Sequence, residues 1–206
     1  MNFTLSSIAE HPETATYTCM LGKTEKIIVR PLMPDDTDKL VTFLQNLSPE
    51  TRRLSVFDGY DLAAAQALCE AINKYDKLRF VVELATDAKN TGPIIGLFEF
   101  SLGLPHADVE RFSKKGITLN EATDCRFGPT LSDEYQGKGL GSALFPYVVK
   151  IARQLARKRI ILWGGVLKDN VRAIHFYEKQ GFKHVSEFMN NGVATLDMFL
   201  ELKAAF

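Results

Sequence analysis

The segment "DEYQGKGLGSAL" places Gly137, Gly139 and Gly141 at alternate positions immediately before a long amphipathic run. A strand-like stretch precedes it and apolar residues then recur at helical spacing, so the pattern predicts a strand, a glycine-rich turn and a helix. The first N–H groups of a helix have no partner within it and lie at the positive end of its dipole. Glycines let an anion approach these groups, which predicts a phosphate site. The alternative is a tight turn that needs positive φ.

Two nucleotide-binding motifs do not fit the same letters. A P-loop, GxxxxGK[ST], requires glycine at Ser132 and a hydroxyl residue at Gly139. The dinucleotide motif GxGxxG requires glycine at Ser142, and the later strand "RIILWGG" lacks the acid that would bind a ribose. The sequence therefore disfavours a nucleotide-dependent enzyme.

Size and charge restrict the class of protein further. The chain has 206 residues, of which 46% are hydrophobic, and this predicts one domain with a sizeable core. Lys and Arg together number 25, as do Asp and Glu, so the zero net charge gives no reason to expect nucleic acid or an anionic membrane as partner. No signal peptide or membrane-spanning run is found, and we expect a soluble cytoplasmic protein.

The cysteines and histidines are too scattered to predict a metal site. Cys19, Cys69 and Cys125 lie far apart without a CxxC pair, and the four histidines are equally dispersed. A disulfide framework or a zinc site would need closer, paired spacing. We therefore predict no metal.

Hydrophobic periodicity predicts alternating strands and helices along the chain. Residues 15–23 and 24–32 are expected to form a hairpin through Gly22. Helices are expected over 35–47 and 61–75, with Ser48 and Pro49 beginning another helix between them. Further strands are expected over 78–85, 93–103, 124–131, 159–166 and 195–202, and the first two of these are expected to pair as antiparallel neighbours. Two more helices are expected, one after Gly141 and one over 170–180. The pattern gives the least information in two ranges. These are residues 1–20, interpreted as an extra N-terminal hairpin or arm, and the polar insertion over 104–120.

Two motifs together resemble the GNAT family of acyl-CoA-dependent N-acetyltransferases. Its pyrophosphate loop, [RQ]xxGx[GA], is matched by Gln136, Gly139 and Gly141, and "LSDEYQGKGLGSALF" is similar to its central strand, loop and helix. "NVRAIHFYEKQGF", residues 170–182, resembles its second motif. Residues 29–54 are similar to the opening of the acetyltransferase domain in bacterial protein-lysine acetyltransferases. The implied fold is α/β, with a mixed central β-sheet flanked by α-helices, as a single domain over residues 1–206.

The resemblance also implies roles for individual residues. The backbone amide of Leu131 would polarise the acyl carbonyl, Tyr177 would protonate the departing thiolate, and Asn170 would cap its helix, contact the pantetheine arm, or both. Tyr177 as an aromatic packing anchor is the alternative. The residues expected to bind acetyl-CoA, the implied co-substrate, are Leu131, Gln136, Gly137, Lys138, Gly139, Leu140, Gly141, Ser142 and Asn170.

The acceptor side is less defined. Some members of the family carry a glutamate on the central strand where this chain has Arg126, so the resemblance does not identify the general base. We predict Asp124, which lies on the same strand face, and Glu99 and Glu121 are further candidates. The acceptor is a primary amine, on a small molecule or a protein lysine, and the family often forms homodimers. The competing hypothesis is a non-catalytic acyl-CoA-binding regulatory module.

Overall fold

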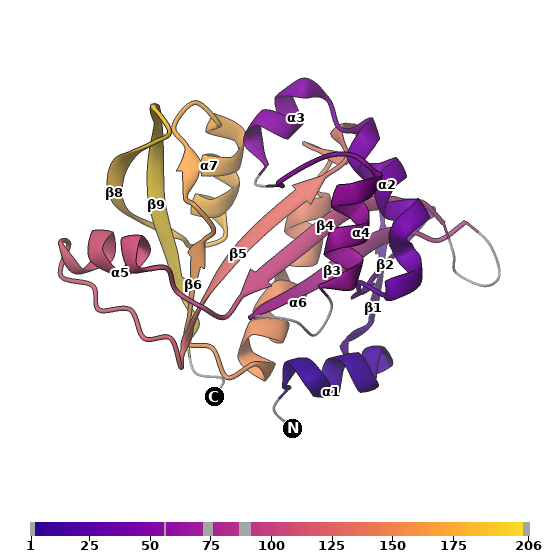
Figure 1. Ribbon diagram of the computed structural model, residues 1–206, viewed down its shortest axis with the longest axis horizontal. Coiled ribbons are helices and arrows are strands. Elements are labelled where there is room, and N and C mark those ends of the chain that lie inside the picture. The colour runs from indigo at the N-terminus through magenta and orange to yellow at the C-terminus, as the bar shows by residue number, and fades with distance from the viewer. Residues whose placement is uncertain (1–2, 56, 72–75, 87–91, 204–206) are drawn as a thin grey trace. The chain divides into compact units, whose positions relative to one another are not determined.

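The computed structural model describes residues 3–55, 57–71, 76–86 and 92–203. Figure 1 labels helices and strands of the described residues. The chain divides into two compact units. The N-terminal unit comprises Phe3–Glu99 and Pro129–Ala143, and the C-terminal unit comprises Phe100–Gly128 and Leu144–Phe206. Two strands and one helix contribute residues to both units. The expected organisation as a single domain stays a prediction.

The strands of the N-terminal unit follow one another in chain order. β1 and β2 form the predicted hairpin, with Cys19 opposite Ile27 and Gly22 in the left-handed region at φ 64°. β2 and β3 are antiparallel, and β4 lies beside β3. The loop expected between β3 and β4 falls mainly on residues 87–91, outside the described residues. The bounds are β1 Tyr17–Leu21, β2 Glu25–Pro31, β3 Lys77–Leu84 and β4 Ile94–Ser101.

The helices of this unit begin where capping residues were expected. Ser48 accepts a hydrogen bond from the Thr51 amide at 3.2 Å, and Pro49 occupies the first turn of α3, as predicted. Leu40, Leu44 and Ala65 pack α2 and α4 into a buried cluster that also includes Leu97 of β4. Thr4 and Ser7 form a capping box that begins an unpredicted N-terminal helix, where a hairpin or arm was expected. The bounds are α1 Leu5–Glu10, α2 Thr37–Asn46, α3 Pro49–Leu54 and α4 Leu62–Glu70.

The C-terminal unit contains the parallel part of the sheet. β5 and β6 are parallel, whereas β9 is antiparallel to β6, β7 and β8. The mixed α/β fold predicted from the sequence is thereby confirmed. The strands are β5 Asp124–Leu131, β6 Arg159–Leu162, β7 Val166–Leu167, β8 Lys183–Asn190 and β9 Val193–Glu201. The helices are α5 His106–Ser113, α6 Leu140–Gln154, which begins in the N-terminal unit, and α7 Val171–Lys179.

Two segments of the C-terminal unit differ from the sequence-based expectation. Residues 159–166 were expected to be one strand, but Gly164 and Gly165 have φ of 71° and 76° and divide it into β6 and β7. The insertion contains α5, whose Arg111 donates from Nε to Asp197 of β9 at 2.9 Å and lies 3.9 Å from the Phe188 ring centroid. A buried ion pair and an aromatic contact therefore attach α5 to the hairpin of β8 and β9.

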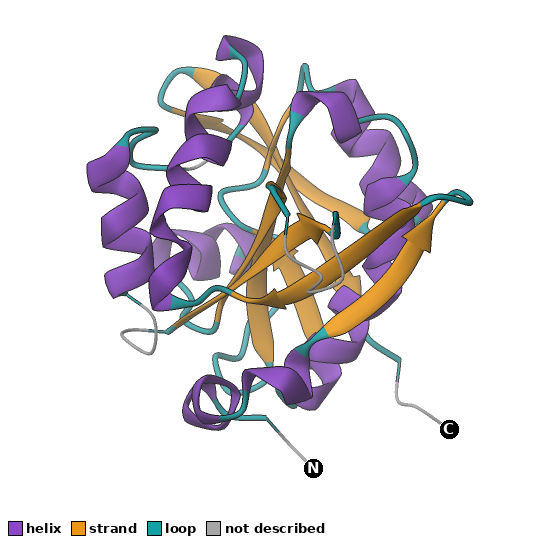
Figure 2. Ribbon diagram, turned by 90° about the vertical axis from the view of Figure 1, so that its right-hand side faces the viewer, coloured by secondary structure: helices purple, strands orange, loops and turns teal. Residues whose placement is uncertain are grey.

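Figure 2 distinguishes the helices of the described chain from its strands. Among these helices, α6 has 15 residues. No helix in the part of the chain that the structure describes is long and apolar enough to cross a membrane.

The close approach of β4 to the end of β5 gives a prediction for stability. A Cβ on Gly96 would lie 2.6 Å from Leu131 Cδ2 and 3.1 Å from the Thr130 carbonyl oxygen. We expect Gly96→Ala to lower the free energy of unfolding by about 1–3 kcal/mol, because the Leu131 side chain has to move and the Thr130 carbonyl has to shift slightly. Gly128→Ala is the control, since its Cβ would meet Trp163 Cβ at an ordinary 3.5 Å. Urea unfolding measures both, and equal losses would contradict the steric argument.

Candidate active site

The chain leaves β5 through a turn that exposes backbone N–H groups. Gly137 and Gly139 have φ of 73° and 85°, and a Cβ at either position would meet nothing within 4 Å. The Ala143 amide donates to the Gly139 carbonyl at 3.0 Å, joining α6 to the turn that precedes it. The N–H groups just before Ala143, including those of Leu140, Gly141 and Ser142, therefore lie at the N-terminus of a 15-residue helix.

This turn fits the pyrophosphate of an acyl-CoA. Left-handed glycines with open space beside them let phosphate oxygens approach the backbone, and the helix dipole favours their negative charge. Lys138 is exposed between the two glycines and adds a positive charge; its Nζ lies 5.9 Å from the Tyr135 ring centroid. The predicted loop residues are thus contiguous at one helix N-terminus, and their contact with acetyl-CoA stays a prediction.

Gln136 points into the protein rather than toward the open side of the loop. Its Nε2 donates to the Leu131 carbonyl at 2.7 Å and to Thr51 Oγ1 at 3.0 Å. The Ser132 amide donates to the Ile95 carbonyl at 2.8 Å, so the peptide between Leu131 and Ser132 is held at both its C=O and its N–H. The expected role of the Leu131 amide depends on this fixed strand end.

The sequence did not indicate two residues behind the loop, Thr51 and Asp133. The Asp133 carboxylate accepts from Ser48 N at 2.9 Å, from Ser48 Oγ at 2.5 Å and from Thr51 Oγ1 at 2.7 Å. Burial by itself would raise the pKa of Asp133, but these hydrogen bonds from Ser48 and Thr51 outweigh it and lower the pKa. The capping signal at Ser48 was readable, whereas nothing local indicated that Asp133 would meet it.

A pocket of about 750 Å³ lies beside these residues in the N-terminal unit. α2, the beginning of β4 and the residues after β5 form its walls, among them Phe43, Ile95 and Asp133. It does not include the glycines of the loop. The pocket and the N-terminus of α6 are therefore separate features of this unit.

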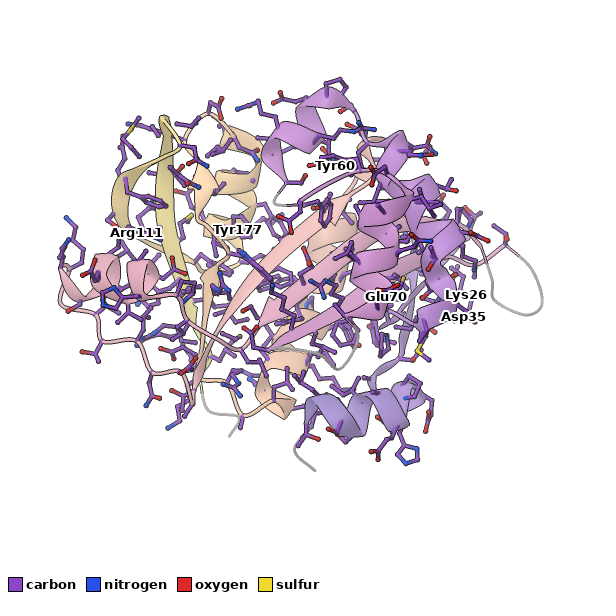
Figure 3. The ribbon with its side chains drawn as sticks, in the orientation of Figure 1. Lys26, Asp35, Tyr60, Glu70, Arg111 and Tyr177 are labelled. Carbon is purple, nitrogen blue, oxygen red and sulfur yellow. The ribbon has the colours of Figure 1, made fainter. Side chains whose placement is uncertain are left out.

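Tyr177 lies in α7 of the C-terminal unit, with 7% of its surface exposed (Figure 3). Its ring centroid is 5.2 Å from that of Phe176 and 5.1 Å from that of Phe182. Burial raises the pKa of the phenol above its ordinary value, so it stays protonated at neutral pH. Tyr177 thus packs as an aromatic anchor, and its role as the proton donor to the thiolate stays a prediction.

Asn170 begins the same helix. Its Oδ1 accepts from the Ala173 amide at 3.1 Å, which confirms the N-cap. The expected contact of Asn170 with a pantetheine arm stays a prediction.

The candidate bases all have protein partners. Asp124, 3% exposed, accepts from Arg159 Nη1 at 3.2 Å and from the Asn120 amide at 2.9 Å. Glu99 is buried and bonded to Arg79 Nε at 2.8 Å; burial raises the pKa of its carboxyl and Arg79 opposes the rise. Glu121 is exposed and accepts from the Leu104 amide at 3.4 Å. Asp124 as the base stays a prediction, and its observed partners indicate a structural ion pair.

Arg126 lies on β5, at the position where the resemblance to the GNAT family implied a glutamate in some members. Its Nη2 donates to Ser101 Oγ at 2.8 Å and its Nε to the Gly103 carbonyl at 3.2 Å. The guanidinium also lies 4.5 Å from the Trp163 ring centroid. This point of β5 therefore carries a cation that is bonded to protein oxygens.

Residues 128–182 match the Acetyltransferase (GNAT) family. An acetyltransferase of Pseudomonas aeruginosa is 25% identical over 131 residues, which cover 62% of this chain and 60% of that relative. The chain thus aligns with less than two thirds of that protein. The predicted resemblance to the GNAT family is confirmed.

Solved structures show the same fold over most of the chain. The GNAT domain of PAT from S. lividans has a TM-score of 0.67 at 19% identity and covers 93% of this chain and 99% of that one. Spermidine N-acetyltransferase from Vibrio cholerae, in complex with CoA and spermine, has a TM-score of 0.61 at 22% identity. It covers 85% of this chain and 95% of that one. At these identities the likeness concerns the fold.

The lowered pKa of Asp133 predicts how acid affects stability. A carboxyl whose pKa is lower in the folded state stabilises it above the unfolded pKa, about 3.9, and this contribution is lost as pH falls through the lower folded pKa. We expect Asp133→Asn to reduce stability at neutral pH and the difference from the original protein to shrink below pH ~4. Urea unfolding across this range measures it. A difference independent of pH would contradict the assignment.

Proposed function

We propose that this protein is an N-acetyltransferase that moves the acetyl group of acetyl-CoA to a primary amine. The observation that carries the proposal is the loop before α6, where Gly137 and Gly139 leave the backbone open to an anion at a helix N-terminus. The family match over residues 128–182 includes this loop and Tyr177. The fold likeness to acetyltransferases supports the same class.

The proposed reaction is a direct attack. The neutral amine nitrogen forms a bond to the thioester carbonyl carbon, and the carbon–sulfur bond breaks with its electron pair going to sulfur. The Leu131 amide donates a hydrogen bond to the carbonyl oxygen as negative charge develops there. Tyr177 gives its phenolic proton to the thiolate, and the new amide nitrogen releases its extra proton to water. Solvent then reprotonates the tyrosine.

The acceptor is proposed only as a class, a primary amine on a small molecule or a protein lysine. The relatives of known structure include enzymes that act on spermidine, and polyamines therefore belong in the first screen. Polyamines are expected to be the weaker acceptors in that screen, because the Arg126 guanidinium would repel a multiply cationic molecule near β5. A screen of polyamines, amino acids and lysine peptides against acetyl-CoA identifies the acceptor.

The loop gives a test of co-substrate binding. We expect Gly139→Ala to weaken CoA binding at least about tenfold, because a methyl group at φ 85° strains the turn and obstructs the phosphates. Gly192→Ala is the matched control, since Gly192 has φ 80° in the turn between β8 and β9 and equally open surroundings. Calorimetry with CoA measures both. Equal affinities in the two variants would mean that the loop does not bind CoA.

Tyr177 gives a test of chemistry. We expect Tyr177→Phe to lower kcat about a hundredfold or more while the affinity for CoA changes little, because the ring remains and only the proton donor is lost. Tyr147→Phe removes another buried phenol, on α6, and serves as the control. Steady-state kinetics with the amine found in the screen measures the effect. Unchanged kcat in Tyr177→Phe would remove the acid assignment.

A second candidate is a non-catalytic module that binds acyl-CoA. It is favoured by Arg126, which stands where relatives carry a carboxylate, and by the ion-paired state of Asp124. This candidate predicts CoA binding without transfer to any amine of the screen. The two candidates are separated by turnover.

A further inference from the structure

A chain of hydrogen bonds connects α3 to the turn before α6. Gln136 Nε2 donates to Thr51 Oγ1 at 3.0 Å, and Thr51 Oγ1 donates to Asp133 Oδ1 at 2.7 Å. Ser48 adds its amide and hydroxyl to the same carboxylate. All four residues belong to the N-terminal unit, and Thr51 is 5% exposed. The start of α3 is thus joined to Asp133 by both Ser48 and Thr51, and the buried Thr51 hydroxyl also accepts from Gln136.

The direction of these bonds is fixed by the chemistry of each group. An ionised carboxylate only accepts, so the Thr51 hydroxyl must donate to Asp133. Its lone pairs are then available to the Gln136 amide, which is a donor. The second N–H of the same amide reaches the Leu131 carbonyl at 2.7 Å. Both amide hydrogens are therefore used, and the side chain can occupy one orientation only.

We propose that Thr51 and Asp133 are positioning residues for the acyl-CoA loop. They hold the Gln136 side chain, which fixes the carbonyl of Leu131 at the end of β5 and the start of the glycine turn. The charge on Asp133 strengthens the bond to Thr51, and a polarised hydroxyl is a better acceptor for Gln136. α3 thus contacts the Gln136 side chain through Thr51, and it contacts Asp133 through both Ser48 and Thr51. The inference rests on the proposed function for its consequence in CoA binding.

The experiment compares Thr51→Val with Thr51→Ser. Valine has nearly the shape of threonine but neither donates nor accepts, whereas serine keeps both bonds. Thr195→Val is the matched control, because Thr195 is 0% exposed and its Oγ1 donates to the Val193 carbonyl at 3.1 Å in β9. Hydrogen exchange of the amides of residues 137–142 is measured in the ligand-free proteins, and CoA affinity by calorimetry.

We expect faster exchange of these loop amides in Thr51→Val, together with CoA binding about five- to tenfold weaker. Thr51→Ser should restore both values, and Thr195→Val should change neither. Gln136→Leu combined with Thr51→Val should lose little more than either change alone, because both break one chain. Additive losses, or exchange in Thr51→Val equal to that of the original protein, would overturn the inference.

The two readouts separate this inference from the proposed function. If the original protein does not bind CoA, the proposed function fails, and the exchange of the ligand-free loop still decides whether Thr51 positions it. If CoA binds and its affinity is unchanged in Thr51→Val, the positioning role is wrong while the proposed function stands. If Thr51→Val does not fold, Gln136→Leu takes its place in both measurements, because it breaks the same chain of hydrogen bonds.

Discussion

The fixed peptide at the end of β5 is the constraint on which the candidate site depends. Its carbonyl, on Leu131, accepts from Gln136, and its N–H, on Ser132, donates to Ile95 of β4. Gly96 lets β4 approach this point, where any side chain would meet Leu131. Because both ends of the peptide are held, the chain can turn away from the strand in one direction and begin α6 with its amides exposed.

Polar groups stabilise this turn where apolar packing cannot. The glycines at 137 and 139 have no side chains to bury, so they add no apolar packing between the buried side chains of Tyr135 and Leu140. Its shape depends instead on Gln136, Thr51 and Asp133, and on the capped start of α3. A turn that binds phosphate has to keep its outer face open to the ligand. The hydrogen bonds that hold the turn therefore have to come from its inner face.

In the C-terminal unit, aromatic packing and ion pairs hold the residues with predicted chemical roles. Tyr177 is placed by aromatic neighbours, and the same burial that packs it raises the pKa of its phenol. Arg126 and Asp124, which share one strand face, each bond to neighbouring protein groups. Tyr177 on α7 is thus a buried, protonated phenol whose role as proton donor stays a prediction, while Arg126 places a cation on β5.

The sequence alone indicated the first hairpin, the helices α2 and α7, the glycine turn and the caps at Ser48 and Asn170, because these depend on local backbone preferences and on periodicity, but it did not indicate α1 or α5. It also indicated the family, through two motifs in the expected order. Only the tertiary structure decided that Asp133 meets Ser48 and Thr51, residues more than 80 positions earlier in the chain. It likewise gave Asp124 its partner Arg159 and divided residues 159–166 into two strands. Long-range contacts of this kind leave no periodic signal, because they form when separate elements pack together.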